Sequence, residues 1–432
     1  MDAKLKNDIA DVHDAESKIS KDQSDESIGI DQYPEGGRDA VMTVVGALLS
    51  NFVQFGVVNL IGPLQAHYSA NQLKGMSESK ISWIGTFLLF FYFFTAAPIG
   101  RVFDSTGPTV LLTVGSVLTV FGLMMVSLCK EYYQFFLAEG LILGVGTALV
   151  FYPALNAIAH FYSKKRGTMM GLTTAGSSIG AIVFPIAFNK LIPTVGFPWA
   201  VRIIGFICLA LLVPMVLLIK SRLPRREFGG LSSVIDFSGL RETTYTLFVV
   251  GAMITGLGLY NPYFYSQTFS EDHGYSDNVS DYIVAIMNAG SLFGRIIPGI
   301  IADRFGVVTL MAFLCTCSAV ILLCWIAVSG PAGLIIWGIF YGFCSGSFLS
   351  LAPACIARFT TDMTAYGGRC GVFFGMISFA TLVSAPIAGA LLDHDSGSFN
   401  HMIIFSGVVY LAGAVFFWAA RISGNSRLMV TF

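Results

Sequence analysis

One arginine in this sequence stands alone inside an apolar stretch. Arg295 is the only charged residue between positions 282 and 302, and Asp303 follows eight positions later. A guanidinium so far from the ends of a hydrophobic stretch is costly and is usually retained for a function. Its planar fork of N–H groups fits a carboxylate at two points. The pattern predicts a site for an organic anion, and the alternative is a structural arginine held by carbonyls or by a carboxylate.

A second pattern matches an enzyme motif. Segment 176–180 reads Gly-Ser-Ser-Ile-Gly, as in the Gly-x-Ser-x-Gly nucleophile motif. That chemistry needs a strand-turn-helix elbow with acid and histidine partners, whereas the apolar run 169–189 predicts a membrane helix. The chain has no His-Glu-x-x-His and no phosphate-binding Gly-x-x-x-x-Gly-Lys-Ser/Thr segment, and its 6 histidines are scattered. We therefore predict that the protein is not an enzyme and that it has no catalytic residue, metal site or cofactor.

The composition is that of a membrane protein. Apolar residues make up 55% of the 432 residues and charged residues 12%, against roughly 25% charged in soluble domains. The formal net charge of -1 offers no basic surface for nucleic acid. The 8 cysteines lie mostly in apolar runs without a Cys-x-x-Cys pair, which predicts packing residues.

Twelve apolar runs approach the roughly 20 residues that span a bilayer. They cover about 41–63, 81–103, 110–128, 133–158, 169–189, 201–219, 247–265, 282–302, 310–328, 332–356, 370–392 and 402–420. The fold class predicted is an all-α membrane protein with twelve transmembrane helices in two six-helix halves. Its predicted segments are a disordered tail (1–38), a first half (39–219), a central loop (220–246), a second half (247–420) and a C-terminal tail (421–432).

Two sequence echoes relate the halves. The segment Gly100–Asp104 is echoed by Gly299–Asp303, an offset of 199, and Pro153 with Ala154 by Pro353 with Ala354, an offset of 200. Two pairs at nearly one offset indicate a six-helix repeat, which is typical of transporters built from two related halves.

Loop charges predict the orientation, because Lys and Arg are retained on the cytoplasmic side. With the N-terminus inside, the inner loops hold Arg101, Lys164, Lys165, Arg166, Lys220, Arg222, Arg225, Arg226, Arg241, Arg304, Arg358 and Arg369. The outer loops hold Lys74, Lys80, Lys130, Lys190 and Arg202. Both termini are therefore expected in the cytosol, and the plasma membrane is the expected location.

The signature segments resemble the monocarboxylate transporter family of the major facilitator superfamily, in its fungal branch. The resemblance rests on Glu35-Gly36-Gly37, on 161–166 (Phe-Tyr-Ser-Lys-Lys-Arg), on 171–180, and on the loop 294–306. It covers residues 34 to about 420. The resemblance implies that Arg295 binds the carboxylate of the solute. The family's proton-carrying lysine and aspartate are replaced here by Asn59 and Ser291, so coupling to protons is not implied.

The predicted substrate-binding residues are Arg295, Asn59, Tyr152, Tyr260 and Ser291. Glu139 could take over a proton-carrying role if it were desolvated, but its place near the outer boundary favours a solvated side chain.

The predicted gating residues are Asp104, Asp303, Arg101, Gly176 and Gly180. The two aspartates end spans two and eight, where a carboxylate could bond to helix ends or basic residues across the interface between halves and latch one state. The alternative is simple helix termination. The glycines recur at helical spacing, which permits close helix contact and sliding, or static packing.

These features predict a secondary active or facilitative transporter of a small organic solute, a monocarboxylate-like or other organic anion. It would work as a monomer in the lipid bilayer by alternating access. Two alternatives stay open: an exporter of a fungal secondary metabolite, and a transporter-like nutrient sensor.

Overall fold

The computed structural model describes residues 33–76, 78–222, 237–361, 365–394 and 398–424. Most of the predicted N-terminal tail and part of the C-terminal tail lie outside these ranges. Every regular element in the described ranges is helical. In the first half they are α2 (Arg38–Val58), α3 (Ile61–Ala70), α4 (Glu78–Phe94), α5 (Ala96–Thr106), α6 (Pro108–Val126), α7 (Tyr132–Phe135), the π-helix η1 (Phe136–Leu143), α8 (Gly144–Ala159) and α9 (Arg166–Leu218). In the second half they are the 3-10 helix η3 (Phe237–Arg241), α10 (Thr243–Leu259), α11 (Asn261–Asp272), α12 (Asp277–Phe305), α13 (Val307–Cys324), the 3-10 helix η4 (Trp325–Ala327), α14 (Pro331–Phe359), α15 (Tyr366–His394) and α16 (Asn400–Gly424).

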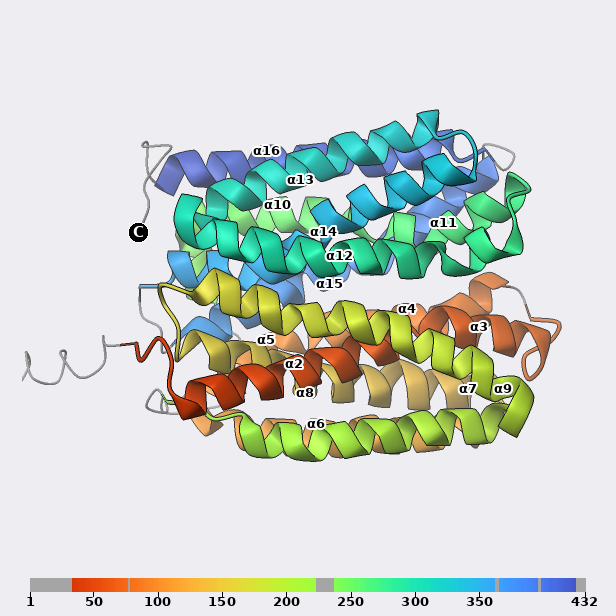
Figure 1. Ribbon diagram of the computed structural model, residues 1–432, viewed down its shortest axis with the longest axis horizontal. Coiled ribbons are helices and arrows are strands. Elements are labelled where there is room, and N and C mark those ends of the chain that lie inside the picture. Colours follow the sequence, from red (N-terminus) through yellow and green to blue (C-terminus); the bar gives the residue numbers. More distant parts are fainter. Residues whose placement is uncertain (1–32, 77, 223–236, 362–364, 395–397, 425–432) are drawn as a thin grey trace, which may run out of the picture.

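The described helices make twelve membrane passes, as predicted. Eleven helical spans are long and apolar enough to cross a bilayer. One of them, α9, has 53 residues, which at about 1.5 Å per residue is roughly 80 Å and far exceeds a hydrocarbon core of about 30 Å. Its backbone leaves helical geometry at Gly196, where φ is 77°. The chain reverses direction there (Figure 1), so α9 supplies two passes.

Two spans are broken at related positions. In the first, α2 ends at Val58 and α3 begins at Ile61; in the seventh, α10 ends at Leu259 and α11 begins at Asn261. The sequence predicts the second break, because Pro262 cannot continue the hydrogen-bond ladder of α10. The first break was not predicted, although Pro63 in the first turn of α3 likewise has no N–H to continue the ladder of α2.

The helices form two bundles, with α2–α9 in one and α10–α16 in the other (Figure 1). Between the bundles, α12 packs along α9 and α15 packs along α4 and α5. The first turn of α2 and the last turn of α16 lie at the same end of the molecule, which we call the terminal end. The opposite end, where α3 and α11 lie, is called the mouth end.

Glycines allow α9 to touch helices on two sides. A Cβ on Gly176 would lie 2.5 Å from the carbonyl oxygen of Leu48, and one on Gly180 would come closer still to that of Phe52. Both contacts are with α2, within the first bundle. Gly171 instead meets the backbone of Arg295 on α12, across the bundle interface. Close packing thus explains Gly176 and Gly180, and a gating role for them stays a prediction.

Candidate solute-binding site and latch

A cavity of about 550 Å³ lies between the two bundles. Its walls come from α2, α3, α4 and α9 on one side and from α10, α11, α12 and α14 on the other. Ala66, Lys190 and Gln267 line it and are exposed, whereas Arg295 lines it and is only 4% exposed. The cavity therefore opens at the mouth end and has Arg295 at its deep end.

Arg295 is held by neutral groups from both bundles. Its Nε donates to Ser291 Oγ, one turn earlier on α12, at 3.1 Å. Its Nη1 donates to the carbonyl oxygen of Thr174, at 3.2 Å, and to the hydroxyl of Ser177, both on α9. The guanidinium also lies over the ring of Phe55, 5.3 Å from its centroid. None of these partners is a carboxylate, so the charge is oriented but not neutralised.

The rest of the described lining is a mixture of apolar and uncharged polar side chains with seven aromatic rings, apart from one further cation. The described lining residues include two cations, Arg295 and Lys190, and no Asp or Glu. The aromatic members of the lining are Phe55, Tyr92, Phe93, Tyr260, Tyr263, Phe264 and Tyr282. The hydroxyls of Tyr263 and Ser345 lie 3.2 Å apart. Such a surface accommodates a largely apolar molecule with one anionic group.

The structure brings together four of the five predicted substrate-binding residues. Arg295, Asn59 and Tyr260 line the cavity, and Ser291 orients the arginine. Tyr152 is absent from the lining: it is 1% exposed, and its ring packs against Phe374 with centroids 5.0 Å apart. A role for Tyr152 in this conformation would have to be indirect.

Several contacts of the site were missed by sequence reasoning. Ser177 stood out only as part of a rejected nucleophile motif, although it contacts Arg295 from the other bundle. Tyr263 was not selected, although it directly follows the predicted break at Pro262. In a chain with 37 phenylalanines and 16 tyrosines, an aromatic residue by itself signals nothing. For Tyr263, the available clue was its place three residues after the predicted Tyr260, which puts both on one face of a helix.

The aspartate at the end of α12 bonds to the first turn of α9 in the other bundle. Oδ1 of Asp303 accepts a hydrogen bond from Gly167 N at 2.8 Å. Oδ2 accepts from Thr168 N at 2.9 Å and from Thr168 Oγ1 at 2.5 Å. The free N–H groups and positive dipole end of a helix favour a carboxylate at this position.

A related contact exists on the other side of the interface. Asp104 on α5 accepts hydrogen bonds from Gly367 N at 3.2 Å and Gly368 N at 2.9 Å, in the first turn of α15. The donors in the two contacts differ by 200 positions, Gly167 against Gly367, and the acids by 199. The two contacts together, which we call the latch, join the two bundles at the terminal end, and a gating role for the two aspartates stays a prediction. The side chain of Arg101, the third predicted gating residue at this end, lies outside the described side chains.

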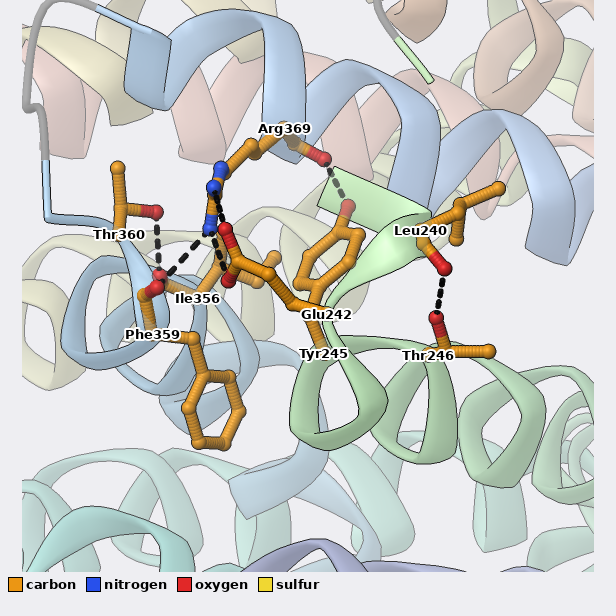
Figure 2. Close-up of polar contacts among 8 residues, drawn as sticks. All are labelled: Leu240, Glu242, Tyr245, Thr246, Ile356, Phe359, Thr360 and Arg369. Atoms are coloured by element: carbon orange, nitrogen blue, oxygen red, sulfur yellow. Dashed lines mark hydrogen bonds and ion pairs between the residues drawn. The ribbon is translucent and has the colours of Figure 1, made fainter. Parts of the chain in front are cut away.

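The first turn of α15 is anchored within its own bundle by Arg369 (Figure 2). Its guanidinium forms an ion pair with Glu242, which precedes α10, and donates to the carbonyl oxygen of Phe359 at 2.9 Å. The hydroxyl of Tyr245 donates to the carbonyl oxygen of Arg369 at 2.7 Å. These contacts join α10, α14 and α15 beside the donors of Asp104. In the sequence, Arg369 is visible only as a loop charge.

The prediction that Glu139 is solvated is wrong. The residue lies in η1 and is 1% exposed. Its Oε2 accepts a hydrogen bond from the hydroxyl of Tyr68 on α3, at 2.7 Å. The first span runs to Ala70, past the predicted end at 63, and this extra length covers the carboxylate.

Comparison with known proteins identifies the family. The model of the Major Facilitator Superfamily matches residues 46–331 and 246–427. MFS-type transporter 1 of Ophiocordyceps sp. (strain BCC 1869) is 40% identical over 92% of this chain and 89% of that protein. The aspyridones efflux protein apdF of Emericella nidulans is 36% identical over 96% of this chain and 86% of that protein.

Solved structures share the fold at low sequence identity. The E. coli fucose:proton symporter FucP aligns with a TM-score of 0.68 at 14% identity, over 87% of this chain and 98% of that chain. The human organic anion transporter MFSD10 aligns with a TM-score of 0.68 at 16% identity, over 89% of this chain and 100% of that chain. With the helical passes, the two bundles and the relatives in agreement, the chain belongs to the major facilitator superfamily of membrane transporters.

Proposed function

We propose that this transporter exports an amphipathic organic anion, such as an acidic secondary metabolite. The observation that carries the proposal is Arg295: a buried cation at the deep end of an open cavity, oriented by neutral groups and without a carboxylate partner among the described residues. A carboxylate or enolate of the solute would supply the missing charge. No catalytic role is proposed for any residue.

The size and lining of the cavity support a solute larger than a short monocarboxylate. Sites of roughly 300–1,000 Å³ hold drug-sized ligands, and this cavity of about 550 Å³ falls within that range. Seven aromatic rings line it, and they offer the apolar part of a larger solute a surface to pack against. The likeness to a protein named for aspyridone efflux favours a metabolite as the solute and export as the direction.

The transport cycle proposed is alternating access. Residues 39–219 would rock against 247–420, and the solute would meet Arg295 near the middle of both. The present arrangement, with the cavity open at the mouth end and the latch formed at the terminal end, would be one of the two states. The latch would break in the other.

The experiment that tests the proposed function is metabolite profiling of producing cells with and without the gene. An exporter should leave its acidic solute inside the cells when deleted and move it to the medium when restored. We also propose that the protein belongs to the fungal branch of the monocarboxylate transporter family. Uptake of an organic acid is therefore the second candidate function, because Arg295 would bind the anion in either direction of transport. Loss of uptake of an external acid, with no retained metabolite, would favour uptake and contradict export.

We propose that the protein is a monomer in the plasma membrane. Its terminal end would face the cytosol. The loop charges support it. A tag inserted at Asp272, which is exposed at the end of α11, should be labelled on intact cells, and tags at the two termini should not. Labelling of a terminal tag on intact cells would contradict the orientation.

A further inference from the structure

The acid buried in the first bundle has no part in the solute site. Glu139 lies in η1, one of the rare π-helical turns that recur at functional sites. Its carboxylate accepts a hydrogen bond from the Tyr68 hydroxyl of α3, its partner in the described structure, while η1 itself packs mainly against α4 and α6. The ion pairs described join Lys220 to Asp39 and Arg369 to Glu242, and neither reaches it.

The titratable groups around η1 do not neutralise this carboxylate. Among the described side chains, those on the elements that adjoin η1 are His67 and Tyr68 of α3, Lys80 and Tyr92 of α4, Cys129, Lys130 and Glu131 before α7, Tyr132 and Tyr133 of α7, Tyr152 of α8, and Lys190 and Arg202 in the mouth-end part of α9. Lys80 lies over the ring of Tyr132, at 5.2 Å from its centroid, and Arg202 donates to Ser127 Oγ at 3.1 Å. The helix α6 contributes no titratable side chain. Burial raises the pKa of the Cys129 thiol to about 11, and the nearby Glu139 adds to that rise.

A carboxyl group in this position is more stable as the neutral acid than as the ionised carboxylate. Burying an ionised carboxylate without a cation is far more costly than burying the protonated form. Ionisation would therefore need water, and a displacement of α3 that withdraws Tyr68 would open the carboxylate to it. The bond from Tyr68 makes α3 the element that responds to the charge.

The same helix forms part of the cavity mouth. Gly62, Pro63 and Ala66 of α3 line the cavity, and α3 is joined to α2 by the break at Asn59 and Leu60. A displacement of α3 from η1 would therefore alter the mouth. Because linkage is reciprocal, a change at the mouth would alter the proton affinity of Glu139 by the same factor.

We propose that Glu139 is a proton-binding site whose occupancy is coupled to the position of α3, so that binding and release of one proton accompany opening and closing of the mouth. The proton exchanges with water, and the carboxylate is the group that gains or loses it. This inference rests on the proposed alternating-access transport, and it assigns the proton a place outside the solute cavity.

The test measures the mouth directly and needs no solute. Genetically encoded spin-label side chains at Ala66 on α3 and Thr268 on α11, both exposed, report the distance across the mouth in purified, lipid-reconstituted protein between pH 5 and 9. We expect the distance to change with pH as a one-proton titration. Glu139→Gln should hold the low-pH distance at every pH, because the amide mimics the neutral acid.

Two further variants separate coupling from damage. Asp272→Asn removes an exposed acid at the same end and should titrate as wild type. Tyr68→Phe keeps the carboxylate but removes the hydrogen bond that ties α3 to it, so the distance should respond to pH much less than in the wild type. A wild-type distance that ignores pH, or a Glu139→Gln variant that titrates normally, would overturn the inference. Failure of anion export would leave these distances unchanged, so the two proposals fail separately.

Discussion

Arg295→Gln is expected to lose nearly all transport of an acidic solute while retaining transport of its neutral amide or ester. Truncating one partner of a buried, hydrogen-bonded charge pair costs about 2–5 kcal/mol, which corresponds to a loss of affinity of at least about 30-fold. Arg295→Lys should keep the charge but lose much of the affinity, because an ammonium cannot replace the planar fork. Uptake by inside-out vesicles of a radiolabelled acid and its neutral analogue measures both effects.

Lys190→Gln is the matched control for this experiment. Lys190 is the other cation of the cavity lining, but it is exposed at the mouth, so its loss should reduce the rate modestly and in a salt-dependent manner. Protein yield and thermal unfolding must be followed in parallel, because Arg295 also joins α12 to α9 through Thr174 and Ser177. A well-folded Arg295→Gln protein that carries the acid normally would refute the anion site.

Asp303→Asn is expected to favour opening of the terminal end. The substitution removes the charge that three donors of Gly167 and Thr168 now share. A charge at a helix N-terminus is worth up to about 2 kcal/mol in a partly buried site, so the equilibrium between the two states should shift roughly 5- to 30-fold. Asp104→Asn should act in the same direction, and the double variant should approach the product of the two shifts, because the contacts share no residue.

Spin labels at Thr109 on α6 and Phe305 on α12 measure this shift. Both residues are exposed at the terminal end, in different bundles, so their separation should increase when the latch weakens. Asp39→Asn is the control: its ion pair with Lys220 is exposed and lies within the first bundle, where such a pair contributes about 0–1 kcal/mol. An unchanged distance distribution in the double variant would show that the aspartates only terminate their helices.

The number of passes and the repeat were determined by the sequence by itself. Spans need about 20 apolar residues because the bilayer offers no water to the backbone, and that requirement is visible without any tertiary contact. The isolated charge of Arg295 was visible for the same reason. The offset between Asp104 and Asp303 also predicted related environments, and the structure places both at the first turn of a helix in the opposite bundle.

The rotation of each helix was decided only by the tertiary structure. A soluble helix shows its buried face by contrast with polar residues, but in a membrane helix the faces toward lipid and toward protein are both apolar. The sequence therefore could not show that Gly176 and Gly180 face α2, or that Tyr152 lies outside the cavity lining. It could not show the burial of Glu139 either, because that depends on how far α3 continues beyond Asn59 and packs over η1. Side chains that share one site here come from helices more than a hundred residues apart, and only packing of the two bundles brings them together.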